Sequence, residues 1–433
     1  MFSGLKNIVK IADLRNKVLF TFAMIGLYLF GTNIPGPGVN YHVVQNLLST
    51  AKTSGGILSF LNLLTGSGLS RMAVFGLGIM PYITSTIIVQ LLGVVIPKFE
   101  EWRDQGAVGQ KKLTQASRYL TIALAIMQAT GLAFLFHGGG GGLFGTGNKY
   151  DFIPDFSAPR VIFLVLTMTA GTAVVMWLAE LITQRGIGQG MSILIFASVL
   201  ASIPGYGASV LSQGGKLKLF IIILVAIAIL TAIVFVEQGQ RRIPVTYAKR
   251  IQGRKMYGGQ TNFIPMKVNQ AGVVPIIFAS SILYFPALLS NIIHFGAFQR
   301  FVQNDLLKPT SGVYIALYGI FILLFAFFYV SIVFDPHQQA DIIKKQGGFI
   351  PGIRPGVQTE RYLAKTLNRI TGFGAVFLTF VALLPSIIFA AWGITGYPYA
   401  GTTLLIAVGV LMDTLRQIDS QLAMRNYEGF LKQ

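Results

Sequence analysis

The sequence predicts an all-α polytopic membrane protein with ten transmembrane helices. Its 433 residues are 53% hydrophobic and only 11% charged, with a mean hydropathy of +0.65, whereas an average soluble domain carries about 25% charged residues. Apolar runs of a length that crosses the hydrocarbon core as a helix recur along the chain. Lys and Arg are concentrated in alternate connections between these runs, as expected when positive charge stays on the cytoplasmic side of a membrane.

Composition excludes several kinds of site. Cysteine is absent, which excludes a disulfide framework, a thiolate metal site and a catalytic thiol. Four histidines are present and are too scattered in sequence to suggest a metal cluster. The sequence has no Gly-x-x-x-x-Gly-Lys-Ser/Thr loop, so the chain is not expected to hydrolyse ATP. We therefore expect no cofactor, no metal and no enzymatic activity.

The apolar runs define ten expected spans. Nine are continuous, and one is interrupted by Gly188, Gly190 and Pro204. The first run is followed by no small-residue cleavage site, so we interpret it as a retained span rather than a signal peptide. In chain order the expected spans are 18–34, 72–96, 116–136, 160–182, 187–205, 217–237, 273–293, 312–334, 372–392 and 401–416.

Charge distribution predicts the orientation of these spans. With the N-terminus in the cytoplasm, 26 of the 34 Lys and Arg residues fall on the cytoplasmic side, and ten spans leave both termini there. The chain divides into two five-span halves, 1–206 and 215–433. An odd number of spans per half makes the halves an inverted repeat, an arrangement that places a site or passage between them in transporters and channels alike. We see no clear sequence identity between the halves, so the repeat is inferred from the span count.

Ionisable residues lie at the ends of the predicted spans rather than deep within them. An ion-coupled transporter usually needs charge near the midplane, where each charged side chain costs roughly 2.5–3.5 kcal/mol. Three acidic residues each precede an arginine by three to five positions. We interpret them mainly as structural ion pairs near the interface: Glu180 with Arg185 (the loosest spacing), Glu237 with Arg241, and Asp413 with Arg416.

A short apolar segment, residues 57–64, follows the first span. Eight helical residues cover only about 12 Å, under half of the bilayer. Glycines flank the segment on both sides. One interpretation is a re-entrant half-helix that enters from the external face and acts as a stopper, which requires surrounding protein or a water-filled cavity. The other is an amphipathic helix that rests on the outer interface.

Two long basic segments lie on the predicted cytoplasmic side. Residues 239–269 hold seven Lys or Arg and no acidic residue, and their pattern predicts a projecting hairpin. Residues 335–371 are predicted to form two short helices around the tip 351–356. Leu363, Leu367 and Ile370 would share one face of the second helix.

Several motifs occur in order along the chain. They are Gly78–Ile83 (GIMPYI), Gly186–Gly190 (GIGQG), Gln240–Lys249 (QRRIPVTYAK), Ala271–Ala279 (AGVVPIIFA), Gly348–Gly356 (GFIPGIRPG) and the tail pair Tyr427-Glu428. Together they resemble the bacterial SecY family, over a stretch from about residue 11 to the end. The resemblance implies a protein-conducting channel of the bacterial plasma (inner) membrane. Such a channel passes unfolded secretory polypeptides and releases transmembrane segments sideways into lipid.

The resemblance also implies roles for individual residues. A ring of apolar side chains closing the pore would consist of Ile79, Ile83, Met191, Ile195, Ile277 and Ile406, with Met191 in place of the isoleucine common in the family. Segment 57–68 matches the plug that covers this ring, with Ile57, Phe60, Leu61 and Leu64 as its apolar residues. Polar positions at the lateral gate would be Ser85, Thr86, Gln128 and Asn269, whose mutual hydrogen bonds could hold the gate shut. Docking of the ribosome or the motor would use Arg254, Lys255 and Arg354.

The partners implied by the resemblance are the SecE and SecG subunits, the motor ATPase SecA and the ribosome, the last through contacts of the basic loops with its RNA. Signal sequences, nascent polypeptides and membrane lipid complete the set. The alternative function is an inverted-repeat secondary transporter of small solutes. The lack of midplane charge, the apolar stripes and the long basic loops favour the channel. A structural scaffold would leave the plug-like segment unexplained.

Overall fold

The computed structural model describes most of the chain. The described residues are 11–40, 65–66, 68–69, 71–137, 156–247, 250–252, 255–257, 261–292, 301–306, 311–392 and 400–431. Within them the N-terminal helices are α2 (Ala12–Gly31), α5 (Met80–Val95), α6 (Pro97–Asp104), α7 (Ala107–His137), α8 (Ala158–Arg185) and α9 (Gly190–Gln238). The later helices are α10 (Val274–Ile292), the π-helical turn η1 (Val302–Leu306), α12 (Gly312–Val333), α13 (Pro336–Lys345), α14 (Val357–Trp392) and α15 (Ala400–Leu431).

The described helices support a polytopic membrane protein. Five are long and apolar enough to span a bilayer, or six if α5 and the sharply bent α6 count as one span; the five cover 158–185, 215–238, 312–345, 357–389 and 401–422. Shorter apolar helical stretches cover 190–204 and 274–283. Helices also form over the expected first and third spans, as α2 and α7. The count of ten spans stays a prediction.

Two span boundaries differ from expectation near glycine and proline. The second span was expected from residue 72, but residues 71–79 form turns and α5 begins at Met80. Gly78 adopts a φ of +56°, which ends the turns. Pro81 lies in the first turn of α5, where its missing N–H is not needed, so Pro81 helps to start the helix and does not kink it. The expected fifth and sixth spans are joined as α9 across Gly215, at a φ of 71°.

The second basic segment also differs from expectation. The first short helix is α13, capped by the Asp335 side chain, which accepts hydrogen bonds from the backbone N–H groups of His337 and Gln338. The second is not a separate short helix, because α14 begins at Val357 and runs on without a break through the expected ninth span to Trp392. The predicted face is confirmed: Leu363 and Leu367 are buried, and Ile370 packs against the same cluster.

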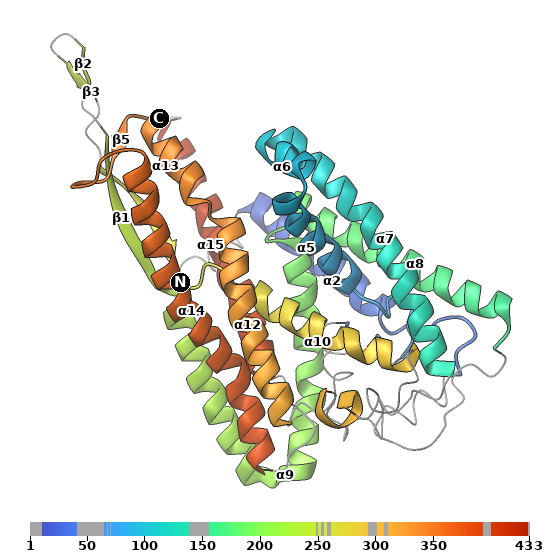
Figure 1. The fold of residues 1–433 in the computed structure, drawn as a ribbon. Helices are drawn as coiled ribbons and strands as arrows, with labels where there is room; N and C mark the ends of the chain where they lie inside the picture. Colours follow the sequence, from blue (N-terminus) through green and yellow to red (C-terminus); the bar gives the residue numbers. More distant parts are fainter. Residues whose placement is uncertain are drawn as a thin grey trace.

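The projecting hairpin is confirmed. Strand β1 (Gln240–Tyr247) pairs antiparallel with β4 (Thr261–Lys267), from Gln240 opposite Lys267 to Thr246 opposite Thr261. The short strands β2 (Arg250–Gln252) and β3 (Lys255–Tyr257) pair at its tip, and β5 (Gly348–Phe349) joins the other edge of β1. Figure 1 shows the tip of the hairpin extending away from the helices.

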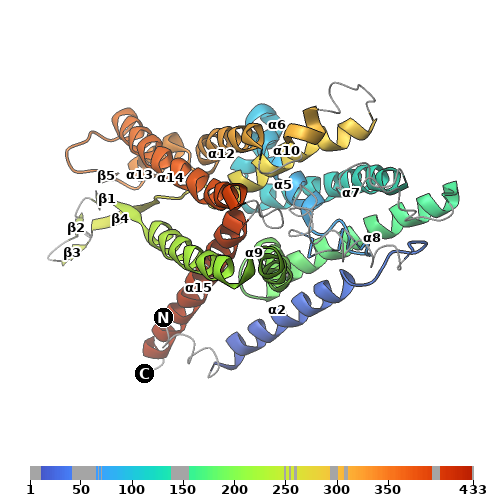
Figure 2. The same ribbon diagram turned by 90° about the horizontal axis from the view of Figure 1, so that it is seen from below.

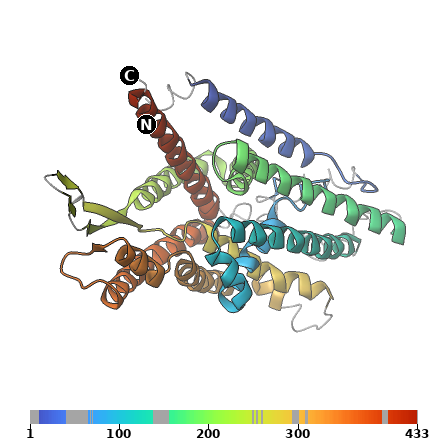
Figure 3. The same ribbon diagram turned by 90° about the horizontal axis from the view of Figure 1, so that it is seen from above.

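One large apolar core cluster joins helices from both ends of the chain. It includes buried residues of α5, α7, α8, α9, α10, α12, α14 and α15. Helix α7 packs against α5 and α8, α12 packs against α10 and α14, and α15 packs against α9 and α14 (Figures 2 and 3). A second cluster lies under the hairpin, where Ile243, Val245 and Met266 meet Ile343 and Leu363. The hairpin is therefore anchored at its base by apolar burial.

Candidate functional site: an apolar waist beside a side cleft

The structure places all six expected ring residues in or against the large cluster. Ile79, Ile195, Ile277, Ile406 and Ile83 are between 0% and 8% exposed and belong to it. Met191 is partly buried and packs against it. These side chains come from α5 and the residue preceding it, from α9, from α10 and from α15. Four separate helices thus contribute the expected ring residues to one apolar region.

The local sequence explains how α5 enters this region. Ile79 is the N-cap residue of α5, and its carbonyl accepts the backbone N–H of Ile83 at 3.1 Å, so the two lie one turn apart. A Cβ at Gly78 would lie 3.1 Å from Cγ2 of Thr65. Gly78 therefore meets two demands, a positive φ and a close neighbour, and it positions Ile79 at the start of the helix.

The expected gate residues do not bond to one another. Ser85 is fully buried and donates to the backbone carbonyl of Ser117 at 2.5 Å, and Thr86 donates to the carbonyl of Tyr82 in its own helix at 2.9 Å. Asn269 is 4% exposed and donates to Glu237 Oε2 at 3.1 Å. The expectation of mutual hydrogen bonds is wrong for this structure. A threonine in a helix readily bonds the carbonyl four residues earlier, and the other partners lie on different helices.

Two consecutive residues of helix α7 form polar contacts with the helices on either side of it, α5 and α8. At Ser117 its carbonyl accepts from Ser85 of α5. At Arg118 its guanidinium forms a bidentate pair with Glu180 of α8, with Nε donating to Oε1 at 2.7 Å and Nη2 donating to Oε2. The Tyr82 hydroxyl lies near the same carboxylate. Helices α5, α7 and α8 are thus joined by polar contacts at one level.

A cleft of about 240 Å³ lies between helices α5, α6 and α7 and the end of α12. On one side it is lined by α5, α6 and α7, including Thr86, Phe99 and Ser117, and on the other by Ile332 and Val333 at the end of α12. Thr86 faces this cleft, and the carbonyl that holds Ser85 belongs to a residue of its lining. Of the four expected gate residues, Thr86 therefore lines the cleft between these helices and α12, and Ser85 bonds to a residue that lines it.

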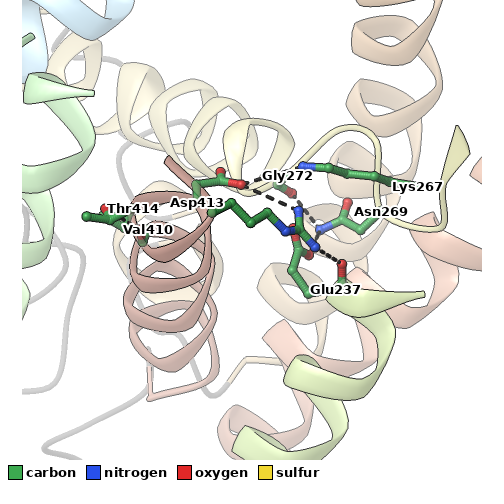
Figure 4. Close-up of polar contacts among 8 residues, drawn as sticks. Glu237, Lys267, Asn269, Gly272, Val410, Asp413 and Thr414 are labelled. Carbon is green, nitrogen blue, oxygen red and sulfur yellow. Dashed lines mark hydrogen bonds and ion pairs between the residues drawn. The ribbon is translucent and has the colours of Figure 1, made fainter. Parts of the chain in front are cut away.

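A polar cluster occupies the place where α9, the β4–α10 connection and α15 meet (Figure 4). Arg416 Nη2 donates to the backbone carbonyl of Glu237 at 2.8 Å, and Arg416 Nη1 lies 3.7 Å from Asp413 Oδ1. The same carboxylate oxygen lies 3.5 Å from Lys267 Nζ. Asn269 also donates to the carbonyl of Gly272 at 3.3 Å. Two acidic and two basic residues thus surround the end of β4.

Two of the three expected ion pairs are wrong. Glu180 pairs with Arg118, because a spacing of five residues places Arg185 about 140° away around the helix. Glu237 does not pair with Arg241, since α9 ends at Gln238 and Arg241 is an exposed residue of strand β1. The pair of Asp413 with Arg416 is confirmed.

The remaining expected residues are placed only in part. The plug residues Ile57, Phe60, Leu61 and Leu64, and Arg254 of the hairpin tip, lie outside the described residues. The backbone of Lys255 lies in β3. Arg354 is exposed in the turn between β5 and α14, where its carbonyl accepts from the Thr359 hydroxyl at 3.0 Å. Gln128 is half-buried on α7.

Comparison with known proteins identifies the family. A sequence profile of the SecY family matches residues 73–415. Proteins named Protein translocase subunit SecY from Mycobacterium bovis and Streptomyces scabiei are 48% and 47% identical to the chain, in alignments that cover 100% of each protein. Two solved structures, described as a protein conducting channel and as Sec61 in a canine ribosome-channel complex, share the fold. Each has a TM-score of 0.59 and covers 93% of this chain and 91% of its own, at 20% and 19% identity. The chain therefore belongs to the SecY family.

Proposed function

We propose that the chain is the channel-forming subunit of a protein translocase, passing unfolded polypeptides across the membrane and releasing transmembrane segments sideways into lipid. Full-length relatives at 47–48% identity carry the name Protein translocase subunit SecY. The single observation that supports the proposal is that the expected ring residues, which come from four helices, all lie in or against the same large apolar cluster.

An apolar constriction formed by the six expected ring residues, called the waist below, suits this function physically. A narrow constriction lined by isoleucine and methionine loses its water, and this dewetting blocks ions. The same lining forms no specific hydrogen bond or ion pair, so side chains of any kind can pass. A transporter of small solutes would need polar groups that recognise its substrate. Ring and plug together would seal the resting channel, with segment 57–68 as the plug.

The cleft beside α12 supports a lateral gate between α5 with α7 on one side and α10 with α12 on the other. Because Ser85 and Arg118 tie α7 to α5 and α8, we expect these three helices to move as one body. Opening would then widen the cleft rather than separate α5 from α7. The proposed halves, 1–206 and 215–433, would be the two bodies that part.

The basic segments support docking of cytoplasmic partners. Arg254 and Lys255 at the hairpin tip, and Arg354 before α14, would contact ribosomal RNA or the motor SecA. SecE would clamp the two halves, and SecG would complete the complex. The protein would be a multi-pass subunit of the plasma membrane, and the excess of Lys and Arg on one side supports an orientation with both termini in the cytoplasm.

Reconstitution tests this function. The purified chain is placed in proteoliposomes with SecE, SecG and SecA, and a secretory precursor and ATP are added. We expect protease-protected precursor inside the vesicles, and none without ATP. Vesicles that take up small solutes but never protect the precursor would contradict the channel and favour a transporter.

A further inference from the structure

The polar cluster at the end of α9 surrounds the connection between the hairpin and α10. This connection covers residues 268–273, since β4 ends at Lys267 and α10 begins at Val274. It is the direct covalent link between a projecting hairpin and a helix that carries an expected ring residue, Ile277. Any displacement of the hairpin along β4 therefore reaches α10 through these six residues.

Backbone contacts hold the start of the connection. The N–H of Val268 donates to the carbonyl of Gly239 at 2.9 Å, which extends the β1–β4 ladder by one step. A Cβ at Gly374 would lie 2.4 Å from the Val268 carbonyl, so α14 approaches the connection backbone to backbone. Gly272 turns the chain into α10 with a φ of +61°.

The middle of the connection is held by one side chain. Asn269 is 4% exposed and donates to the Glu237 carboxylate, which is itself in a residue only 6% exposed. Figure 4 shows this contact reaching from the end of α9 to the connection. Arg416 of α15 fixes the backbone of Glu237 through the carbonyl of that residue. The connection is thereby tied through Glu237 to α9 and α15.

The cluster is only partly satisfied. Asn269 Oδ1, Gln270 Oε1 and Arg416 Nη1 are buried and have no hydrogen-bond partner among the described residues. Each such atom carries a desolvation penalty, and a buried carboxylate carries a larger one. These penalties offset part of the stabilisation that the contact between Asn269 and Glu237 provides. The contact between Asn269 and Glu237 therefore holds the connection in one position but is weak enough to be broken.

We propose that Glu237 is a positioning residue of the channel: its carboxylate holds Asn269 and sets the resting position of α10. This inference rests on the function proposed above. When a cytoplasmic partner displaces the hairpin, the contact between Asn269 and Glu237 breaks and α10 shifts with Ile277. Because α10 packs against α12, the shift widens the cleft between α12 and α5.

The test measures that cleft directly. The chain has no cysteine, so cysteines introduced at Thr86 and Val333, on opposite walls of the cleft, are the only labelling sites. Spin labels there report the distance between α5 and α12 in the assembled complex. Glu237→Ala removes the acceptor for Asn269, and Glu237→Gln keeps an acceptor oxygen. Glu360→Ala is the matched control, since Glu360 also contacts another helix, through His337, but lies away from the connection.

We expect Glu237→Ala to raise the population with the wider separation about tenfold, the change that corresponds to losing one hydrogen bond to a charged group. Glu237→Gln should raise it by about threefold at most, and Glu360→Ala should leave it unchanged.

If Glu237→Ala does not fold, Asn269→Leu tests the same contact from the other side. Identical distributions for the background, Glu237→Ala and Asn269→Leu would overturn the inference, and so would equal shifts for Glu237→Ala and Glu360→Ala. Translocation by the unsubstituted chain is measured in parallel. Its absence would count against the channel function, whereas translocation with unchanged distances in the Glu237 variants would count against the role of Glu237 alone.

Discussion

The pair of Arg118 and Glu180 offers the sharpest energetic prediction. The pair is bidentate and joins α7 to α8, with side chains that are 44% and 16% exposed. A hydrogen bond to a charged group contributes about 1.5–3 kcal/mol when buried, and the exposure of the arginine reduces this toward the lower value for surface pairs. We therefore expect a coupling free energy of about 1 kcal/mol between the two residues.

The two single variants should be unequal. Arg118→Ala leaves the mostly buried Glu180 carboxylate without its charged partner, so we expect a loss of about 2 kcal/mol in the free energy of unfolding. Glu180→Ala leaves an arginine that can reach water, and we expect a loss of about 1 kcal/mol. The physical reason for the difference is the exposure of the group that remains.

Denaturant unfolding of the purified chain in detergent measures these changes, through a double-mutant cycle of both alanine variants. The exchanged variant, Arg118→Glu with Glu180→Arg, serves as the control and should recover most of the loss. A coupling below about 0.3 kcal/mol, within the scatter of additive changes, would refute the reasoning. Equal losses for the two single variants would refute the argument from exposure.

Two further predictions concern the waist and the basic loop. Ile406→Asn should increase ion leak through the resting complex in proteoliposomes, because a polar side chain hydrates the constriction, while Ile406→Val should not; equal leak for both would contradict an apolar seal. Arg354→Glu should lower SecA-driven export by about tenfold with no change in the amount of inserted protein, and Lys345→Glu on α13 is the matched exposed control. Normal export by Arg354→Glu would remove this residue from the docking surface.

The sequence was sufficient for the features that depend on local pattern. Apolar runs predicted the helices, because a segment that spans the membrane must form all its backbone hydrogen bonds internally and present apolar side chains to the lipid. The hairpin followed from basic strands flanking a glycine-containing turn, and the shared face of Leu363 and Leu367 followed from helical spacing. The motifs carried the assignment of the family.

Features that depend on contacts between distant helices were missed. Sequence spacing suggested partners for Glu180 and Glu237 on their own helices, but their partners lie 62 and 32 residues away. Lys267 and Asp413 likewise meet only through the fold. The available signal was weak: charged residues of opposite sign stand at the same end of neighbouring spans. Nothing in such a pattern selects one partner among several.

Helix boundaries were missed for a different reason. Residues 72–79 are as apolar as the helix that follows, so hydropathy alone extends the span through them. Gly76 and Gly78 permit turns there, and a side chain at Gly76 would lie 2.8 Å from the carbonyl of Ala73. The positive φ at Gly78 is a property of the folded chain. The sequence shows only that a glycine stands there, which permits this conformation but does not predict it.

Crosslinking from the waist tests the central claim most directly. A photoreactive residue at Ile83 or Ile277 is compared with one at Phe163, an exposed position on α8, in complexes that hold a stalled secretory chain. The account predicts adducts between the stalled chain and both waist positions, and none at Phe163. A stalled chain that is translocated halfway and yet never reacts with Ile83 or Ile277 would contradict it.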